Sequence, residues 1–278
     1  MRFAIDVAPL GDLADPATIV RLARLAEESG WDGISIWDSF GVSMGTSAAD
    51  PFVALAGVAA TTERLRLIVS VAALPRRRPQ LVAQAAGTLD RLSGGRLVLG
   101  VGAGGDPADF EAFGEPADAP TRVARLDESV ALVDALLRGE TVSHDGPAFV
   151  VRGVAVGPRP VQQPRPPIWF GAMRPAGLRR AAAWDGWIAI AVADDGSGMT
   201  LSPDDLRSRL DRVLAERARL SRGGEAFDVA VFGLSGPEQP WSPAEYAAAG
   251  ATWWLESLSG MRGSPDELAI LVGAGPPR

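Results

Sequence analysis

The sequence predicts a single α/β domain, a closed (β/α)8 TIM barrel that uses the whole chain, residues 1–278. Three observations support this prediction. Residues 50–105 alternate helix and strand patterns, as in a right-handed βαβ unit of a parallel sheet. The alternation continues until eight strands are placed, the number that closes a parallel barrel. The length of 278 residues is close to the roughly 250 residues of one such barrel.

The stretch from Asp50 to Gly105 predicts two helices and two strands. Its first helix begins at Pro51, where a missing N–H costs little. Residues 67–73 and 97–101 are apolar runs of strand length, and residues 79–92 separate them with helical spacing. The expected buried face of that helix consists of Leu81, Val82, Ala85, Ala86, Leu89 and Leu92. Both strands end in small residues, so we expect open space for a ligand beyond their carboxyl ends.

The remaining elements follow the same alternation. Further strands are expected at residues 3–8, 33–37, 168–171, 186–192, 227–233 and 251–256. Further helices are expected at residues 15–29, 122–138, 175–184, 203–220, 242–249 and 265–272. Residues 139–159 predict a β-hairpin excursion between the fourth helix and the fifth strand, because a Gly-Pro turn separates two extended arms. No long polar linker divides the chain, which therefore predicts one domain.

The composition excludes several classes of function. The net charge of −7, with the arginines scattered, argues against nucleic acid or an anionic membrane as partner. The absence of cysteine excludes disulfides, thiol nucleophiles and cysteine-ligated metals. His144 is the one histidine, so no multi-histidine metal site is expected. Without a long apolar run or the apolar core of a signal peptide, the chain is expected to be cytoplasmic.

Several segments resemble the bacterial luciferase-like superfamily, which comprises flavin- or F420-dependent oxidoreductases on a (β/α)8 barrel. These segments are DPFVALAGVAATTERLRL, QAAGTLDRLSGGRLVLGVGAGG, EAFGEP, RVARLDESV, GPRPVQQPRPPIWFGA and the terminal GPPR. The most specific of them is LDRLSGGRLVLGVGAG, and together they cover nearly the whole chain in the same order. The resemblance implies a flavin-type cofactor at the carboxyl ends of the strands, and a homodimer that forms through barrel helices.

The resemblance also implies roles for particular residues. A non-prolyl cis peptide bond between Ser70 and Val71 would support the back face of the cofactor ring. Asp38 ends the second strand, where F420-dependent relatives often carry an Asp-His pair, but Ser39 stands in place of the histidine. Asp38 is therefore a weak catalytic candidate, expected to hydrogen-bond a ring N–H, and the proton donor is left unidentified.

Two glycine-containing segments are expected to hold the rest of the cofactor. Gly102, Ala103 and Gly104 would let the backbone approach the ring or its ribityl chain, and Asp106 would contact the tail. A dinucleotide-binding loop is a weaker interpretation of the same residues, because Pro107 interrupts it. The phosphate is expected at a turn before a helix N-terminus, where N–H groups and an arginine favour an anion. That turn consists of Gly171, Ala172, Met173 and Arg174.

Three other groups of residues are interpreted as mainly structural. Arg76, Arg77 and Arg78 form a positive run that we expect to be solvated rather than to attract an anion. His144 is expected in the hairpin, away from the barrel mouth, which disfavours a Ser-His-Asp triad. Trp253 and Trp254 are expected to face the core on one side and to line a pocket on the other.

The favoured function is hydride transfer between reduced F420 and a small organic substrate. The Ser-Val pair and the GPPR terminus favour F420, whereas the missing histidine argues against an F420-dependent dehydrogenase. One alternative is an FMNH2-dependent monooxygenase fed by a separate reductase, and another is a flavin-binding relative without catalysis. The mouth loops, residues 39–50, 104–121 and 193–202, carry few distinctive polar groups, so the sequence does not identify the substrate.

Overall fold

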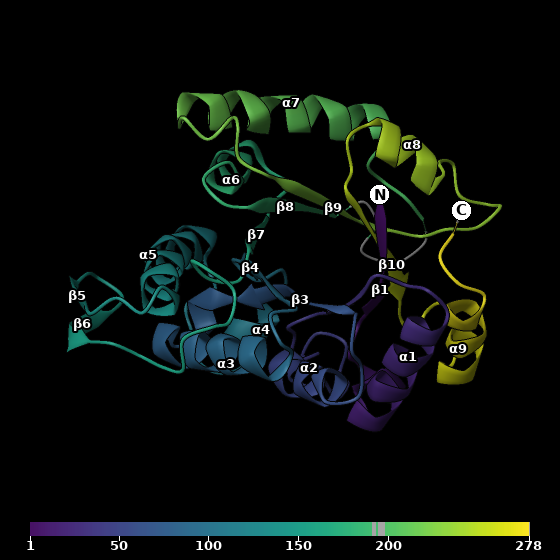
Figure 1. Ribbon diagram of the computed structural model, residues 1–278, viewed down its shortest axis with the longest axis horizontal. Helices are drawn as coiled ribbons and strands as arrows, with labels where there is room; N and C mark the ends of the chain where they lie inside the picture. Colours follow the sequence, from purple (N-terminus) through teal and green to yellow (C-terminus); the bar gives the residue numbers. More distant parts are fainter. Residues whose placement is uncertain (191–192, 194–197, 278) are drawn as a thin grey trace.

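The computed structural model describes residues 1–190, 193 and 198–277, which form a closed barrel of eight parallel strands (Figure 1). The strands are β1 (Arg2–Val7), β2 (Gly33–Ile36), β3 (Arg66–Ala73), β4 (Leu97–Gly102), β7 (Ile168–Gly171), β8 (Gly186–Ile190), β9 (Asp228–Gly233) and β10 (Trp253–Leu258). They follow one another around the barrel, and β10 pairs with β1 to close it. The predicted (β/α)8 barrel is confirmed. The end of the predicted strand 186–192 lies outside the described residues.

Helices surround the barrel and connect successive strands. They are α1 (Pro16–Glu28), α2 (Pro51–Ala59), α3 (Pro79–Leu92), α4 (Ala108–Glu111), α5 (Ala119–Leu137), α6 (Pro175–Ala181), α7 (Pro203–Arg219), α8 (Pro243–Ala248) and α9 (Pro265–Gly273). Two 3-10 turns, Gly11–Ala14 and Leu74–Arg76, supplement them. Most of these helices begin with proline behind an Asp or Ser cap, such as Asp50 before α2 and Ser264 before α9. This chemistry explains why their starts could be predicted closely.

The barrel interior is filled at its amino-terminal end by large aromatic side chains. Trp169 of β7 and Trp253 of β10 meet edge to face with ring centroids 5.8 Å apart, and Arg2 lies over the Trp253 ring. Trp254 points outward and packs on Tyr246 of α8. Neither Trp253 nor Trp254 has exposed surface, so the prediction that this pair lines a pocket is wrong. Trp253 opens its strand at the end opposite the mouth, where it fills the core.

The buried face of α3 is shifted from the one that the sequence pattern indicates. Val82, Ala86 and Leu89 are buried as predicted, but Leu81 is 60% exposed and Leu92 is 52% exposed. Ala83 is buried in their place. The face of α3 that meets the barrel therefore excludes Leu81 and Leu92, and both leucines lie at the solvent-exposed edge of the helix.

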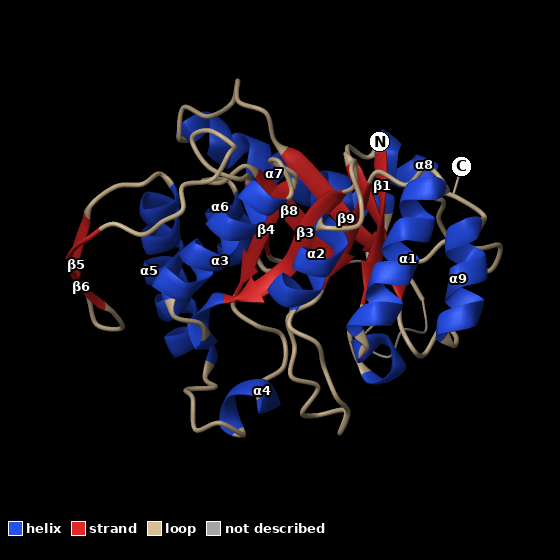
Figure 2. Ribbon diagram, turned by 60° about the horizontal axis from the view of Figure 1, so that its bottom comes forward, coloured by secondary structure: helices blue, strands red, loops and turns tan. Residues whose placement is uncertain are grey.

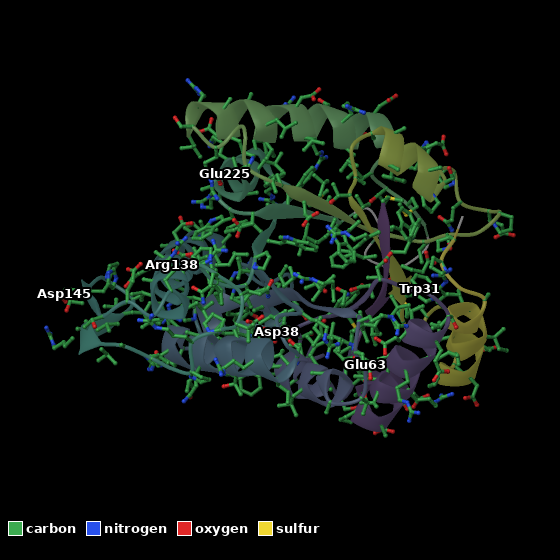
Figure 3. All side chains as sticks on the ribbon, in the orientation of Figure 1. Trp31, Asp38, Glu63, Arg138, Asp145 and Glu225 are labelled. Carbon is green, nitrogen blue, oxygen red and sulfur yellow. The ribbon has the colours of Figure 1, made fainter. Side chains whose placement is uncertain are left out.

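The predicted hairpin excursion is confirmed, and it projects from the barrel beside α5 (Figure 1). It consists of β5 (Val142–Asp145) paired antiparallel with β6 (Val150–Val154). Glu128 of α5 anchors it: the Nε2 atom of His144 lies 2.7 Å from Glu128 Oε1, and the Phe149 N–H donates to the same oxygen. Figure 3 shows Asp145, next to His144, at the far end of the molecule from α9.

The loops that follow the strands gather at one end of the barrel. Figure 2 shows α4 and the neighbouring loops projecting from this end, while the N-terminus lies at the opposite end. This mouth is where a parallel barrel binds ligands. Among the described residues, no helix is both long enough and apolar enough to cross a membrane.

Candidate functional site

Val71 occupies the centre of the site at the mouth. The Ser70–Val71 peptide bond is cis, as predicted, and the pairing of β3 with β4 shifts register between Val69 and Ala72. A Cβ atom added to Gly102 would lie 2.6 Å from Val71 Cγ2, and one added to Gly171 would lie 2.9 Å from Val71 Cγ1. The two glycines therefore make room for the Val71 side chain, which remains partly exposed.

This arrangement changes the physical role of Gly102. The sequence predicts that its missing side chain leaves space for a cofactor, but Val71 already occupies that space. A ligand in the mouth would meet the valine rather than the glycine. Gly104 behaves similarly, because a Cβ atom there would lie 2.7 Å from the Phe110 ring, and its φ of +81° favours glycine in any case.

The loop that follows β4 is tied to the loop that follows β2. Asp106 accepts hydrogen bonds from the Ser43 hydroxyl at 2.5 Å and from the Ala108 N–H at 2.9 Å. Ala103, which precedes this loop, is half-buried. The prediction that Asp106 and Ala103 contact a cofactor stays a prediction. The contacts in the structure give Asp106 a role in holding the two loops together.

Asp38 lies in a cluster of ion pairs rather than at a free strand tip. Its carboxylate accepts from Arg76 at 2.8 Å, from Arg77 Nε at 2.8 Å and from the Ala73 N–H at 2.9 Å. The Asp38 side chain is 2% exposed. Burial alone would raise the pKa of Asp38, but the hydrogen bond from Arg77 and the charges of both arginines hold it below its usual value. Asp38 is therefore an ionised anchor.

Arg76 connects three mouth loops. It donates to Asp109 at 3.0 Å as well as to Asp38, and its guanidinium lies 4.4 Å from the centre of the Phe40 ring. Its side chain is 4% exposed, and Arg77 also bridges to Asp50. The prediction that these two arginines are solvated is wrong, because acidic residues from neighbouring loops surround them. Arg78 alone of the run is exposed.

Asp109 completes this cluster from α4, an element that the sequence analysis missed. It accepts from the Ser39 hydroxyl at 2.9 Å and from the N–H groups of Phe40 and Val42. Burial opposes ionisation of Asp109, but these hydrogen bonds and the charge of Arg76 lower its pKa. Ser39, the residue after Asp38, thus helps to hold this loop through its hydrogen bond to Asp109.

Asp6 is a second functional candidate that the sequence analysis missed. It lies near the carboxyl end of β1 with no exposed surface. Trp37 Nε1 donates to Asp6 Oδ2 at 2.6 Å, and the Ser70 hydroxyl donates to Oδ1 at 3.2 Å. Burial raises the pKa of Asp6 to about 7, although hydrogen bonds from Ser35, Trp37 and Ser70 act against it. A single acidic residue inside the apolar run of residues 3–8 is the signal that could have identified it.

Ser70 links the buried acid to the mouth. Its hydroxyl contacts the Ser35 hydroxyl as well as Asp6, and Val71 follows it in the chain. Trp37 faces Phe232 of β9 with ring centroids 6.4 Å apart. The mouth thus combines the apolar side chain of Val71, which we call the ledge, with the Asp6 carboxyl group beneath it. This carboxyl group can hold a proton near neutral pH.

The turn at the end of β7 is held by hydrogen bonds from α7 and β8. Trp187 Nε1 donates to the Ala172 carbonyl at 2.7 Å, and Arg209 donates to the Met173 carbonyl at 2.8 Å. Arg174 caps α6 by position but makes no side-chain capping bond, and its side chain is exposed. The structure thus brings Gly171 beside Val71, whereas the predicted anion contact at this turn stays a prediction.

Potential metal ligands do not gather in the part of the chain that the structure describes. No group of three or more His, Asp or Glu side chains there is arranged to hold an ion. His144 lies in the hairpin, paired with Glu128, as described above.

Comparisons with known proteins identify the family of this chain. The family model described as luciferase-like monooxygenase matches residues 2–235. A Mycobacterium tuberculosis protein described as uncharacterized is 32% identical over 254 residues, covering 85% of this chain and 82% of its own length.

Solved structures share the fold over almost the whole chain. Monooxygenase RslO1 from Streptomyces bottropensis has a TM-score of 0.78 at 20% identity and covers 98% of both chains. An F420-dependent tetrahydromethanopterin reductase from Methanopyrus kandleri has a TM-score of 0.77 at 19% identity, covering 98% of this chain and 97% of that chain. An F420-dependent secondary alcohol dehydrogenase has a TM-score of 0.79 at 15% identity, covering 98% of both chains. With the family model matching most of its length, this chain belongs to the luciferase-like monooxygenase family, whose members include F420- and FMN-dependent oxidoreductases.

Proposed function

We propose that this chain is an F420-dependent oxidoreductase that transfers hydride between the cofactor and a small organic substrate at the barrel mouth. The observation that carries the proposal is the position of Val71. Its partly exposed side chain rests on Gly102 and Gly171 at the centre of the mouth, which offers a flat ring an apolar ledge.

We favour F420 over FMN because of the features of the Ser70–Val71 pair and of the GPPR segment noted in the sequence.

The residues at the mouth fit a flavin-type cofactor. Val71 would support one face of the ring, and the turn from Gly171 to Arg174 would meet the phosphate. When bound, F420 supplies two-electron hydride chemistry, while the protein supplies position and electrostatics. Asp38 and Asp106 hold the loops that border this space, through Arg77 and Ser43 respectively.

Asp6 is the residue to which we assign the proton that accompanies hydride transfer. Reduction of a carbonyl or an imine adds one hydride and one proton, and position 39 offers no acid because Ser39 donates to Asp109. With a pKa near 7, Asp6 holds its proton at a carboxyl oxygen near neutral pH. The Ser70 hydroxyl, bonded to Asp6 Oδ1, carries the hydrogen-bond connection toward the mouth.

An FMNH2-dependent monooxygenase fed by a separate reductase is the second candidate. The observation that favours it is the similarity to monooxygenase RslO1, which covers 98% of both chains. In either case we propose a cytoplasmic homodimer that acts on a small molecule, with no nucleic acid or membrane partner.

The test is a side-by-side titration of the protein with F420 and FMN, followed by turnover assays without oxygen. Preferential binding of F420 and oxygen-independent oxidation of reduced F420 by a carbonyl or imine substrate panel would support the proposal. Preferential binding of FMN would instead support the monooxygenase. Saturable binding without turnover on any acceptor would indicate a relative that has lost catalysis.

A further inference from the structure

A groove lined by arginine lies between α6 and α7, next to the β7–α6 turn. It encloses about 230 Å³. Met173 and Pro175 form the wall nearest the turn, and Ser208, Arg209 and Arg212 form the wall that α7 contributes. Arg209 and Arg212 are three residues apart, so both face the groove from the same side of the helix.

The groove adjoins the turn that ends β7, through Met173. Arg209 Nη1 donates to the Met173 carbonyl at 2.8 Å, and Met173 Sδ accepts from the Ile190 N–H at the end of β8. Gly171, two residues before Met173, contacts the Val71 side chain. A ligand with its ring on Val71 would therefore extend along the turn and enter the groove at Arg209.

The α7 arginines differ in what they bind. Arg217 is buried and donates to the Ala182 and Trp184 carbonyls, and Arg207 donates to the Ala248 carbonyl. Arg212 is exposed, and among the described residues it forms no hydrogen bond or ion pair. Its guanidinium is thus available to a ligand in a way that the guanidinium of Arg217 is not.

The groove also contains one carboxylate. Asp205 lines it, one helical turn before Arg209, and its Oδ2 lies 3.0 Å from the Ser202 hydroxyl that caps the helix. With two guanidinium groups and one carboxylate, the groove keeps a net positive charge. Guanidinium groups pair with carboxylates through two parallel hydrogen bonds, so the groove suits an acidic ligand.

We infer that Arg209 and Arg212 bind the acidic tail of F420, the carboxylate-bearing glutamate units beyond its phosphate. This inference rests on the proposed function, because it takes F420 as the cofactor. FMN ends at its phosphate and offers nothing to the far end of the groove. The groove therefore distinguishes the two cofactors by their tails, whereas the ledge at Val71 contacts only the ring.

The test compares dissociation constants for F420 and for its glutamate-free form, measured by cofactor fluorescence without turnover. In the variant Arg212→Glu we expect the dissociation constant of F420 to rise about tenfold at low salt, and less at high salt. The glutamate-free form should bind this variant within about twofold of wild type. Asp205→Asn removes the opposing charge and should tighten F420 alone by about twofold to threefold.

Arg219→Glu is the matched control, because it makes the same charge change on the same helix at a side chain that is 81% exposed. It should leave both dissociation constants unchanged. Equal losses for both cofactor forms in Arg212→Glu would overturn the inference, as would no loss for either, while the proposed function would stand. If wild type binds neither form, the proposed function fails first and the inference falls with it.

Discussion

The two sides of the barrel mouth use charge in opposite ways. On the side of β2, β3 and β4, Asp38, Arg76 and Asp109 are almost fully buried and bind one another. On the side of β7 and β8, Arg174 and Arg212 are exposed beside a turn whose carbonyls are held by other residues. The comparison teaches that the charge run most visible in the sequence has a structural role, while scattered arginines remain available to a ligand.

The largest effect is expected from Arg76→Ala on the buried side. The substitution leaves the carboxylates of Asp38 and Asp109 buried without one of their cations, which should reduce the free energy of unfolding by about 3–5 kcal/mol. Urea denaturation measures this loss.

Arg78→Ala is the control for that experiment, since Arg78 is exposed two residues away and makes no side-chain capping bond. It should change stability by less than about 0.5 kcal/mol. Similar losses of stability for both variants would contradict a structural role specific to the buried Arg76, on which the comparison of the two sides depends.

The second effect is a pH dependence on the buried side. The folded chain holds a proton on Asp6 up to about pH 7, whereas the unfolded chain releases it near 3.8. Between these values the folded state binds more protons, so the contribution of Asp6 to stability is greatest at acid pH and falls as the pH rises to 7. The loss amounts to about 4 kcal/mol.

Denaturation of wild type and Asp6→Asn between pH 4 and pH 8 measures this effect. The stability of wild type relative to the variant should decline across that window and then level off. A constant difference across the same range would contradict the assignment of a raised pKa to Asp6.

A smaller effect is expected from Gly102→Ala, at the boundary between the two sides. The added methyl would lie 2.6 Å from Val71 Cγ2, so Val71 must move. We expect a loss of about 1–3 kcal/mol from overpacking, together with weaker cofactor binding. Gly105→Ala is the control, because nothing lies within 4 Å of a Cβ atom there. Weaker binding in both variants would argue against a specific role for the ledge.

The smallest effect on stability is expected from Arg212→Ala, on the exposed side. Melting and urea denaturation should change by less than about 0.5 kcal/mol. A large destabilisation would show that Arg212 supports the fold, which would argue against its proposed role in binding a ligand.

Much of the fold could be predicted because local chemistry marks it. The helix at residues 79–92 and the strand at residues 168–171 match the observed bounds, since proline, caps and apolar runs define their ends. Helix α4 was missed because four residues are too few to display a helical period.

The site was harder to predict, because its decisive contacts join distant segments. Arg76 meets Asp109 across 33 positions, so a run of arginines gives no sign that it is buried. Gly102 and Gly171 were correctly placed at strand ends. Their role in making room for Val71 could not be predicted, because it depends on β3, β4 and β7 lying side by side. Asp6 stands alone in an apolar run, and its neighbours Ser35 and Ser70 come from other strands.

The pairing of His144 with Glu128 has a practical consequence. Because the chain contains a single histidine, a proton NMR spectrum shows one imidazole spin system, already assigned without mutagenesis. Its chemical shifts report whether the hairpin is seated against α5. That signal provides an internal reference during cofactor titrations, since it lies far from the mouth and should stay constant while resonances near Val71 move.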